Sequence, residues 1–321
     1  MHSFKELLQD FDSKFNTRHF PNEPATLYDS AQYILSLGGK RVRPVMCLMG
    51  NELFDDINPD AYHVATAIEL FHNFSLIHDD IMDKAPLRRG MPTVHAKFGE
   101  STALLAGDVM LVMCYEYLNK IDELHKKRIL SLFNKTALEV SEGQQLDMDF
   151  EKINSVSLNE YIRMIELKTS VLLGASLKLG AIIGGASEGN VNHLYEFGKN
   201  LGIAFQVQDD YLDAFGDPDK FGKQVGGDII ANKKTFLLIH TMDVAEEQLK
   251  QELLYLMQTN PADKVQRVLV IMKACNADAW AKELKEKYVS EAMRHLEEIA
   301  VMSKRKEPLR ELAQFLVQRD H

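Results

Sequence analysis

Hydrophobic residues recur every three or four positions along almost the whole chain, which is the spacing of one face of an α-helix. Residues 64–82 are a clear case, with Ala65, Ile68, Leu76 and Ile77 among the apolar positions. Alternating runs typical of strands are scarce, and most of the nine prolines fall where helices should begin or end. The pattern predicts an all-α fold.

The chain carries no sign of internal division. No Ser/Gly linker, charge block or repeat separates its parts, so we predict one large helical bundle, a single domain over residues 1–321. Residues 245–321 are charge-rich and amphipathic, which predicts helices on the outside of that bundle. The longest apolar stretch, 171–186, is interrupted by Lys178 and four glycines and is shorter than the roughly 20 residues of a membrane span. Because the N-terminus also lacks the apolar core of a signal peptide, we expect a cytoplasmic protein.

Charge narrows the range of ligands. With 47 acidic and 37 basic residues the net charge is −10, the wrong sign for nucleic-acid binding through a broad basic surface. An anionic ligand must therefore be held by local basic groups or by metal ions. Cys47, Cys114 and Cys275 are widely spaced in apolar segments, which indicates buried thiols in a reducing compartment.

Two segments share the pattern Asp-Asp-x-x-Asp, residues 79–83 and 209–213. On a helix, Asp79 and Asp83 lie on one face and repel each other by roughly 0.2–0.5 kcal/mol, so a cation should offset them. Carboxylate ligands without adjoining cysteine pairs favour a hard cation, most simply Mg²⁺, which shares its coordination with substrate phosphates. The alternative is a solvated helix face on which Lys84 pairs with Asp80, but that leaves the second motif unexplained.

Glycines precede the second motif. Counting back from Asp209 by helical turns gives Gln206 or Phe205, then Gly202, then Gly198. Either a neighbouring helix packs very closely there, or a cavity opens beneath the aspartates. A deep apolar cavity under a metal-diphosphate site would suit a long hydrocarbon attached to a diphosphate.

Basic residues of the kind that grip phosphate oxygens gather in four short segments. These are residues 38–44 with Lys40, Arg41 and Arg43, then Arg88-Arg89, then Lys168-Thr169, and finally residues 223–234 with Asp228 and Lys233. His72 lies two helical turns before Asp79 on the same face, where it could donate to a phosphate, although a buried structural histidine is the commoner case.

Together these motifs resemble the trans-isoprenyl diphosphate synthases, also called the polyprenyl synthetase family. The resemblance covers nearly the whole chain and rests on Gly38–Pro44, Leu76–Asp83, Leu87–Gly90, Leu105–Asp108, Gly143–Asp147, Lys168-Thr169, Phe205–Asp213 and Gly226–Asp228. It implies an all-α terpenoid-synthase fold with a central deep apolar cavity, usually dimeric. The implied reaction joins isopentenyl diphosphate to an allylic diphosphate (dimethylallyl, geranyl or farnesyl) and has no need of nucleic acid.

The resemblance also implies a role for each motif residue. Mg²⁺ would be coordinated by Asp79, Asp83 and Asp209, with Asp80, Asp213 and Asp228 assisting, partly through water. The allylic diphosphate would be held by Arg88, Lys168 and Lys233, with help from Lys223, which stands one residue further from Asp228 than in some relatives. Isopentenyl diphosphate would be held by Lys40, Arg43, His72 and Arg89, and the reacting carbons would face Thr169 and Gln206.

Product length is expected to depend on the residues five and four positions before the first aspartate, Phe74 and Ser75. By the resemblance, one aromatic beside one small residue favours a geranylgeranyl (C20) product over a farnesyl (C15) product. On an ideal helical wheel Ser75 lies under Asp79, whereas Phe74 turns to the side. Water must be excluded from the reaction, so we expect a lid, for which Lys304–Lys306 is a candidate.

Three other functions are compatible with parts of the pattern. A class I terpene cyclase would share the first aspartate motif, but would usually carry an Asn/Ser/Glu motif in place of the second. A His-Asp phosphohydrolase is suggested by His78-Asp79, yet it needs further histidine ligands. A non-catalytic regulatory subunit of a synthase would not require two complete metal motifs.

Overall fold

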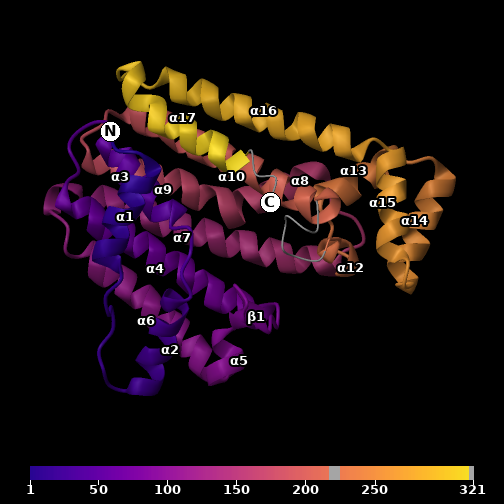
Figure 1. The fold of residues 1–321 in the computed structure, drawn as a ribbon, viewed down its shortest axis with the longest axis horizontal. Helices are drawn as coiled ribbons and strands as arrows, with labels where there is room; N and C mark the ends of the chain where they lie inside the picture. The colour runs from indigo at the N-terminus through magenta and orange to yellow at the C-terminus, as the bar shows by residue number, and fades with distance from the viewer. Residues whose placement is uncertain (217–224, 318–321) are drawn as a thin grey trace. The chain divides into compact units, whose positions relative to one another are not determined.

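The three- and four-residue periodicity does form helices. The computed structural model describes residues 1–216 and 225–317, and 78% of these described residues are helical, which confirms the all-α prediction. The elements (Figure 1) are α1 (Phe4–Phe15), α2 (Ala25–Ser36), α3 (Val42–Glu52), α4 (Pro59–Met82), β1 (Leu87–Arg88), β2 (Met91–Pro92), α5 (Val94–Phe98), α6 (Glu100–Leu118), α7 (Glu123–Lys152), α8 (Leu158–Ile165), η1 (Glu166–Ser170), α9 (Val171–Ile183), α10 (Glu188–Phe215), α12 (Gly227–Ile230), α13 (Phe236–Val244), α14 (Glu247–Thr259), α15 (Lys264–Ala274), α16 (Ala277–Glu298) and α17 (Ser303–Val317). Lys223 lies outside the described residues.

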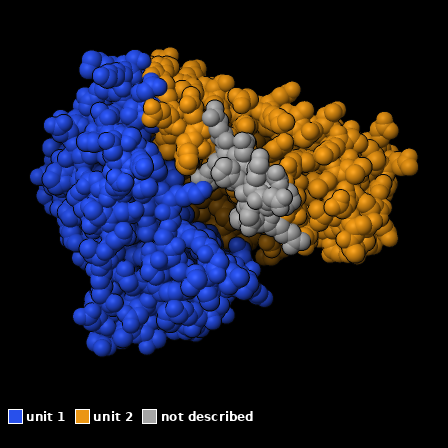
Figure 2. All heavy atoms as spheres, in the orientation of Figure 1, with its two compact units in different colours: residues 1–135, 175–195, 300–308 blue, residues 136–174, 196–299, 309–321 orange. Residues whose placement is uncertain are grey.

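The chain divides into two compact units, which Figure 2 draws in different colours. Unit 1 consists of Met1–Lys135, Ala175–Tyr195 and Ala300–Pro308, and unit 2 of Thr136–Gly174, Glu196–Ile299 and Leu309–His321. Four of the five boundaries between these segments fall inside α7, α9, α10 and α17, and the fifth lies between α16 and α17. A single domain over residues 1–321 stays a prediction.

Helices α4 and α6 pack side by side in unit 1 (Figure 1). Helix α4 begins at a typical N-terminal signal, because the Asn58 side chain accepts a hydrogen bond from the Asp60 amide and Pro59 occupies the first turn. Ala65 and Ile68 are buried, as the periodicity predicted. Burial of this apolar face fixes the helix that ends at the first aspartate motif.

The only strands among the described residues form a short antiparallel hairpin, β1 and β2, that follows α4. Arg88 pairs with Met91, so Arg89 and Gly90 make a two-residue turn. Both turn residues have positive φ, 54° and 76°, which is the requirement of a type I′ turn. The hairpin therefore presents Arg88 and Arg89 at defined positions directly after the motif.

Unit 2 has its own apolar core, to which α8, α13, α15 and α16 contribute buried residues such as Tyr161, Phe236, Val268 and Ala281. The charge-rich C-terminal segment forms α14 to α17, each of which buries an apolar face. This confirms the amphipathic helices expected over residues 245–317.

Helix α6 has an unusual surface. Large apolar side chains are exposed on it, including Leu104, Leu105 and Val112 at 50–59% exposure. It is also the one helix among the described residues that is long and apolar enough to cross a membrane by length and composition alone, with a third of its most apolar stretch buried.

The three cysteines are free thiols. Cys47 and Cys114 are buried, as expected, whereas Cys275 is only half-buried at the end of α15. The prediction of a buried core thiol is wrong for Cys275.

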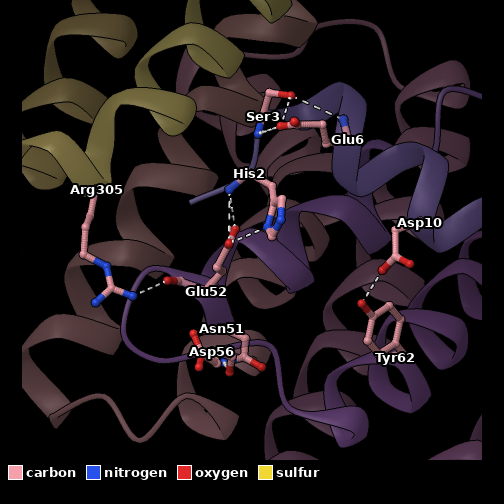
Figure 3. Close-up of polar contacts among 9 residues, drawn as sticks. All are labelled: His2, Ser3, Glu6, Asp10, Asn51, Glu52, Asp56, Tyr62 and Arg305. Atoms are coloured by element: carbon pink, nitrogen blue, oxygen red, sulfur yellow. Dashed lines mark hydrogen bonds and ion pairs between the residues drawn. The ribbon is translucent and has the colours of Figure 1, made fainter.

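The basic segment proposed as a lid is held by hydrogen bonds (Figure 3). Arg305 donates to the backbone oxygen of Glu52 at 2.7 Å, and the Glu52 carboxylate accepts from the backbone amide of His2 at 2.9 Å. Lys306 is 4% exposed within α17. The segment around Arg305 is therefore packed into unit 1, and the structure gives no support to its role as a lid.

Candidate active site

The first aspartate motif stands at the C-terminal end of α4. The helix ends at Met82, and Asp83 caps it by donating its backbone amide to the Asp79 oxygen at 2.8 Å. Asp79 is half-buried and Asp83 is exposed, so the two carboxylates predicted to share a helix face are both accessible to a ligand.

Asp80 behaves differently from its neighbours. It is 2% exposed, and Arg88 donates to both of its oxygens at 2.7 Å, from Nε and Nη2. The interpretation in which Lys84 pairs with an exposed Asp80 is therefore wrong, because the carboxylate turns inward to the hairpin. In this arrangement Asp80 can assist a metal only through water or after Arg88 moves.

The three basic residues after the glycine pair have different roles: Arg41 is used within the fold, whereas Lys40 and Arg43 are candidates for binding a ligand. Arg41 forms a buried ion pair with Glu69 and donates to the Leu35 oxygen at 3.1 Å. Asn73 donates to the same Glu69 carboxylate at 3.0 Å. Arg41 therefore stabilises the packing of α3 against α4, while the exposed Lys40 and the half-buried Arg43 flank it.

Arg43 and His72 form a cationic pair of side chains in unit 1. Arg43 Nη1 lies 3.2 Å from His72 Nε2, and because arginine only donates, His72 accepts at Nε2 and carries its proton on Nδ1. Burial, reinforced by Arg43 and Arg89, lowers the pKa of His72 well below 6.5, so the ring is neutral at pH 7. Burial also lowers the pKa of Arg43 to about 10, which leaves it charged, and its buried Nε has no partner among the described residues. This arrangement offers a charged guanidinium with an unused donor to an anion.

Arg89 connects the glycine pair to the hairpin. It donates to the Gly38 oxygen, and a Cβ at Gly39 would lie 3.1 Å from its Nη2. Gly38 and Gly39 also have φ of 76° and 152°, in the region that glycine tolerates best. The structure thus brings two of the predicted basic segments together.

The residues expected to set product length lie on α4, one turn before the motif. Phe74 packs between Phe71 and His78, with ring centroids 5.6 Å and 4.7 Å away. Ser75 donates to the His72 backbone oxygen at 2.9 Å, so its small side chain folds back on its own helix. The sideways position expected for Phe74 on an ideal wheel agrees with these neighbours.

Unit 2 contains a pocket of about 540 Å³ around the second motif. Its lining includes six of the predicted residues: Lys168, Thr169, Gln206, Asp209, Asp228 and Lys233. Asp213 lies alongside, where its carboxylate accepts from the Asp228 backbone amide at 2.9 Å. Three separate segments of the sequence therefore converge on one polar cavity.

Lys168 and Thr169 belong to a π-helical segment, η1, between α8 and α9. A Cβ on Gly143 of α7 would lie 2.7 Å from Lys168 Cα, and one on Gly202 of α10 would lie 2.8 Å from Ser170 Cα. At Gly202 the close-packing alternative is therefore correct, and the deep apolar cavity stays a prediction. The two glycines let α7 and α10 approach the π segment, a type of bulge that is frequent at functional sites.

Two lysines of the pocket have a carboxylate neighbour, whereas the third, Lys234, donates to the Phe150 backbone oxygen at 2.7 Å. Lys168 donates to Asp147 at 2.5 Å, and Lys233 lies 3.6 Å from Asp228. Asp147 stands in a segment that the resemblance included, but no role was predicted for it. These ion pairs hold both lysines at the cavity that they line.

A buried network beneath the second motif was also missed. Asp210 is 6% exposed and accepts hydrogen bonds from the Tyr161 hydroxyl and, at 2.9 Å, from Gln206. Burial, then repulsion from Asp228, raises the pKa of Asp210 to about 7. Gln206 is thus held by Asp210 at the pocket wall. Tyr161 belongs to an ordinary amphipathic helix, so nothing in its sequence context marked it.

The pocket suits a hard cation. Burial raises the pKa of Asp228, and repulsion from Asp213 adds to the effect, so a positive charge bound here would relieve both. Among the described residues no three Asp, Glu, His or Cys side chains converge into a complete metal site. A cation held here would therefore take further oxygens from water or from a bound phosphate, as Mg²⁺ commonly does.

Comparison with known proteins agrees with this arrangement. Residues 24–274 match the family described as Polyprenyl synthetase. The geranylgeranyl diphosphate synthase of Saccharolobus solfataricus is 40% identical over 301 residues, 92% of this chain and 90% of that protein. A crystal structure of a geranylgeranyl pyrophosphate synthase matches with a TM-score of 0.95 at 42% identity and 99% coverage of both chains. The geranylgeranyl pyrophosphate synthetase from Pyrococcus horikoshii matches with a TM-score of 0.92 at 38% identity, over 98% of this chain and 97% of that one. The chain therefore belongs to the polyprenyl synthetase family and has the all-α isoprenoid synthase fold.

Proposed function

We propose that this trans-prenyltransferase joins isopentenyl diphosphate to dimethylallyl, geranyl or farnesyl diphosphate and forms all-trans geranylgeranyl diphosphate (C20). The observation that carries the proposal is the unit 2 pocket, in which Asp209 and Asp228 share one cavity with Lys168 and Lys233. Such a cavity combines cation ligands with phosphate ligands. The C20 product, in preference to C15, is supported by the names of the relatives and by the single aromatic at Phe74.

The metal of this proposal is Mg²⁺, held by Asp79, Asp83 and Asp209, with Asp80, Asp213 and Asp228 assisting. When bound, Mg²⁺ would neutralise the negative charge that develops on the departing diphosphate. Lys168, Lys233 and Arg88 would hold the same diphosphate, with Lys223 as a further candidate. Charged donors fixed before the reaction stabilise that charge without reorganising.

Isopentenyl diphosphate would bind to the cationic groups of unit 1. The Arg43–His72 pair supports this assignment, since a buried guanidinium nitrogen without a partner is costly unless a ligand accepts from it. His72 would donate from Nδ1, and Lys40 and Arg89 would complete the set. The glycine pair that seats Arg89 explains why the segment needs residues without side chains.

The reaction itself needs little covalent help from the protein. The allylic carbon–oxygen bond breaks with its electrons on the diphosphate, and the isopentenyl double bond attacks the resulting cation. A proton is then lost, and the released diphosphate is the base we propose. Thr169 and Gln206 would face the reacting carbons, with Gln206 oriented by Asp210. Exclusion of water keeps the cation from forming an alcohol.

The three alternative functions are less well supported than a prenyltransferase. His78 Nε2 donates to the Leu104 oxygen at 3.2 Å, so it is occupied within the fold and is no metal ligand of a His-Asp phosphohydrolase. The family match disfavours a terpene cyclase. Both aspartate motifs are complete, which disfavours a regulatory subunit.

We further propose a cytoplasmic homodimer that buries the exposed face of α6. Leu104, Val112 and Tyr115 lie on this face and are 39–59% exposed, and large exposed apolar side chains gathered on one helix face are typical of interaction sites. Asp108 stands exposed between Leu104 and Val112, and a carboxylate there disfavours lipid as the covering medium. The free buried thiol Cys114 on the same helix agrees with a reducing compartment.

The test is an assay with labelled isopentenyl diphosphate and each allylic diphosphate in turn, with product lengths resolved. The wild type should make C20 product with Mg²⁺ and none with EDTA, and added Mg²⁺ should restore it. Asp209→Asn should lower turnover by about 10²–10³-fold, comparable with the loss of a key electrostatic group. Asp263→Asn, at an aspartate whose side chain is 61% exposed, is the matched control. Condensation that persists in EDTA and in Asp209→Asn contradicts the metal assignment, and cyclised hydrocarbon or free phosphate as the only product contradicts the reaction.

A further inference from the structure

His78, the residue immediately before the first aspartate motif, is clamped between α4 and α6. Because a carbonyl oxygen only accepts, His78 donates from Nε2 to the Leu104 oxygen of α6 at 3.2 Å. The same nitrogen lies 3.8 Å from the Asp108 carboxylate. Both partners belong to α6, so the ring is held by the neighbouring helix and not by its own.

The ring occupies a notch that only glycine provides. A Cβ on Gly107 would lie 2.5 Å from His78 Cδ2 and closer still to Nε2, well inside van der Waals contact. Gly107 lies in the interior of α6, where glycine is a poor helix former. Its presence is explained by the histidine ring that fills the space where its side chain would be.

His78 in turn supports Phe74. The two rings meet edge to face, with centroids 4.7 Å apart and planes at 64°. Phe71 contacts Phe74 from the other side at 5.6 Å, and itself packs on Phe133 at 5.4 Å. The Phe74 ring therefore lies between two aromatic neighbours on α4, and both contacts hold it in its observed rotamer.

We propose that His78, seated in the Gly107 notch of α6, is a positioning residue that holds the Phe74 ring in place and thereby limits product length. The inference rests on the proposed function, since Phe74 acts on the product only if the chain elongates a prenyl diphosphate. Leu104 and Gly107 fix the position of the His78 ring, and the His78 ring fixes the position of the Phe74 ring. The Phe74 ring then contacts the end of the growing hydrocarbon and stops elongation. Position 78 thus controls where elongation stops without touching the reacting atoms.

Four variants test this sequence of contacts. His78→Ala removes the support, and Gly107→Ala fills the notch and displaces the ring, so both should raise the ratio of C25 to C20 product by about tenfold, the scale on which apolar pockets discriminate small size differences. His78→Gln can still donate to the Leu104 oxygen and should restore part of the C20 preference. Gly189→Ala is the matched control, because nothing lies within 4 Å of a Cβ at that helical glycine.

Double variants distinguish a positioning role of His78 from a general loss of structure. If Gly107 acts through His78, the double variant His78→Ala/Gly107→Ala should show the product ratio of His78→Ala alone, and not the product of the two effects. In a Phe74→Ala background, His78→Ala should change the ratio no further. The KM for isopentenyl diphosphate, measured with each variant, should change much less than the product ratio.

The outcomes separate the two proposals. An unchanged C25 to C20 ratio in folded His78→Ala and Gly107→Ala, with condensation intact, overturns the role of His78. An unchanged ratio in Phe74→Ala removes Phe74 from the limit on chain length, and the role of His78 with it, while the prenyltransferase function stands. Absence of condensation in the wild type contradicts the proposed function itself.

Discussion

Arg88 donates to both carboxylate oxygens of Asp80 at 2.7 Å, and so ties the β1–β2 hairpin to the end of α4. Asp80 is nearly inaccessible, whereas the Arg88 side chain is 26% exposed and reaches the surface. The pair therefore orients Arg88 toward solvent, where a diphosphate could accept from its remaining donors. Bidentate pairs of this kind are geometrically specific.

Replacement of Arg88 by lysine should expose this specificity. A lysine at this position would keep the charge but lose one of the two parallel hydrogen bonds, so we expect kcat/KM for the allylic diphosphate to fall by about tenfold or more, with a smaller effect on the KM for isopentenyl diphosphate. Steady-state kinetics with farnesyl diphosphate as the varied substrate measures this. Arg128→Lys is the matched control, since Arg128 pairs with Glu188 at an exposed site. Equal kinetics for Arg88→Lys and Arg128→Lys would show that the fork geometry has no role.

The close packing of Gly143 against η1 predicts that a side chain at position 143 lowers both stability and turnover. Gly143→Ala would place a methyl group against the Lys168 backbone, so α7 or η1 must shift. We expect a loss of about 1–3 kcal/mol in the free energy of unfolding, as in overpacked cores, together with reduced turnover from misplaced Lys168 and Thr169. Urea denaturation and the condensation assay measure the two effects separately. Gly189→Ala should lower neither quantity, because its methyl group meets open space and alanine is the better helix former. Normal turnover in Gly143→Ala would mean that the position of η1 is not critical.

Enlarging Ser75 should shorten the product, whereas truncating Phe74 should lengthen it. Its side chain is small and folds back on the His72 oxygen at 2.9 Å, one turn before Asp79. Ser75→Phe adds bulk along the path of elongation, and we expect the main product to shorten from C20 to C15. Ser75→Ala removes only the hydroxyl and should keep the C20 product. Chromatography of the dephosphorylated products checks both, and a C20 product from Ser75→Phe would exclude Ser75 from the path.

Two buried histidines predict that acid destabilises the fold. Burial lowers the pKa of His72 and that of His19, which is 8% exposed and hydrogen-bonded to the Phe15 oxygen at 2.8 Å. In the unfolded chain both titrate near pH 6.5. Below that pH the unfolded state binds a proton at each histidine that the folded state does not, so the two histidines lower the free energy of unfolding as the pH drops from about 7.5 to 5.5. Asp210 opposes one of them, because its pKa is raised to about 7 and there the folded state binds the proton. The slope is at most about 1.4 kcal/mol per pH unit for each histidine.

Urea denaturation at several pH values measures that slope. His19→Gln and the double variant His19→Gln/His72→Gln should flatten it step by step, because each replacement removes one titrating group. His125→Gln, at a half-buried histidine on α7, is the control. An identical slope in the wild type and the double variant would mean that other groups cause the acid sensitivity.

Much of the candidate site could be predicted from the sequence. Helical periodicity is a local property, and the two aspartate motifs and the basic segments are each contiguous, so the fold class and the residue types of the site were accessible without coordinates. For the glycines before the second motif, the sequence left two alternatives open: close packing of a neighbouring helix, or a cavity. At Gly202 the backbone of Ser170 decides in favour of packing.

The tertiary structure alone decided which charged groups are available to a ligand. Nothing in the sequence of Lys40, Arg41 and Arg43 shows that Arg41 forms an ion pair with Glu69, 28 positions away. Nor does it show that the buried Nε of Arg43 has no hydrogen-bond acceptor in the described part of the chain. In the same way, Tyr161 meets Asp210 across 49 positions, and no local motif marks it. The physical reason is that a side chain's partner is set by long-range packing of helices, whereas its tendency to be helical, charged or metal-binding is set by its type and its near neighbours.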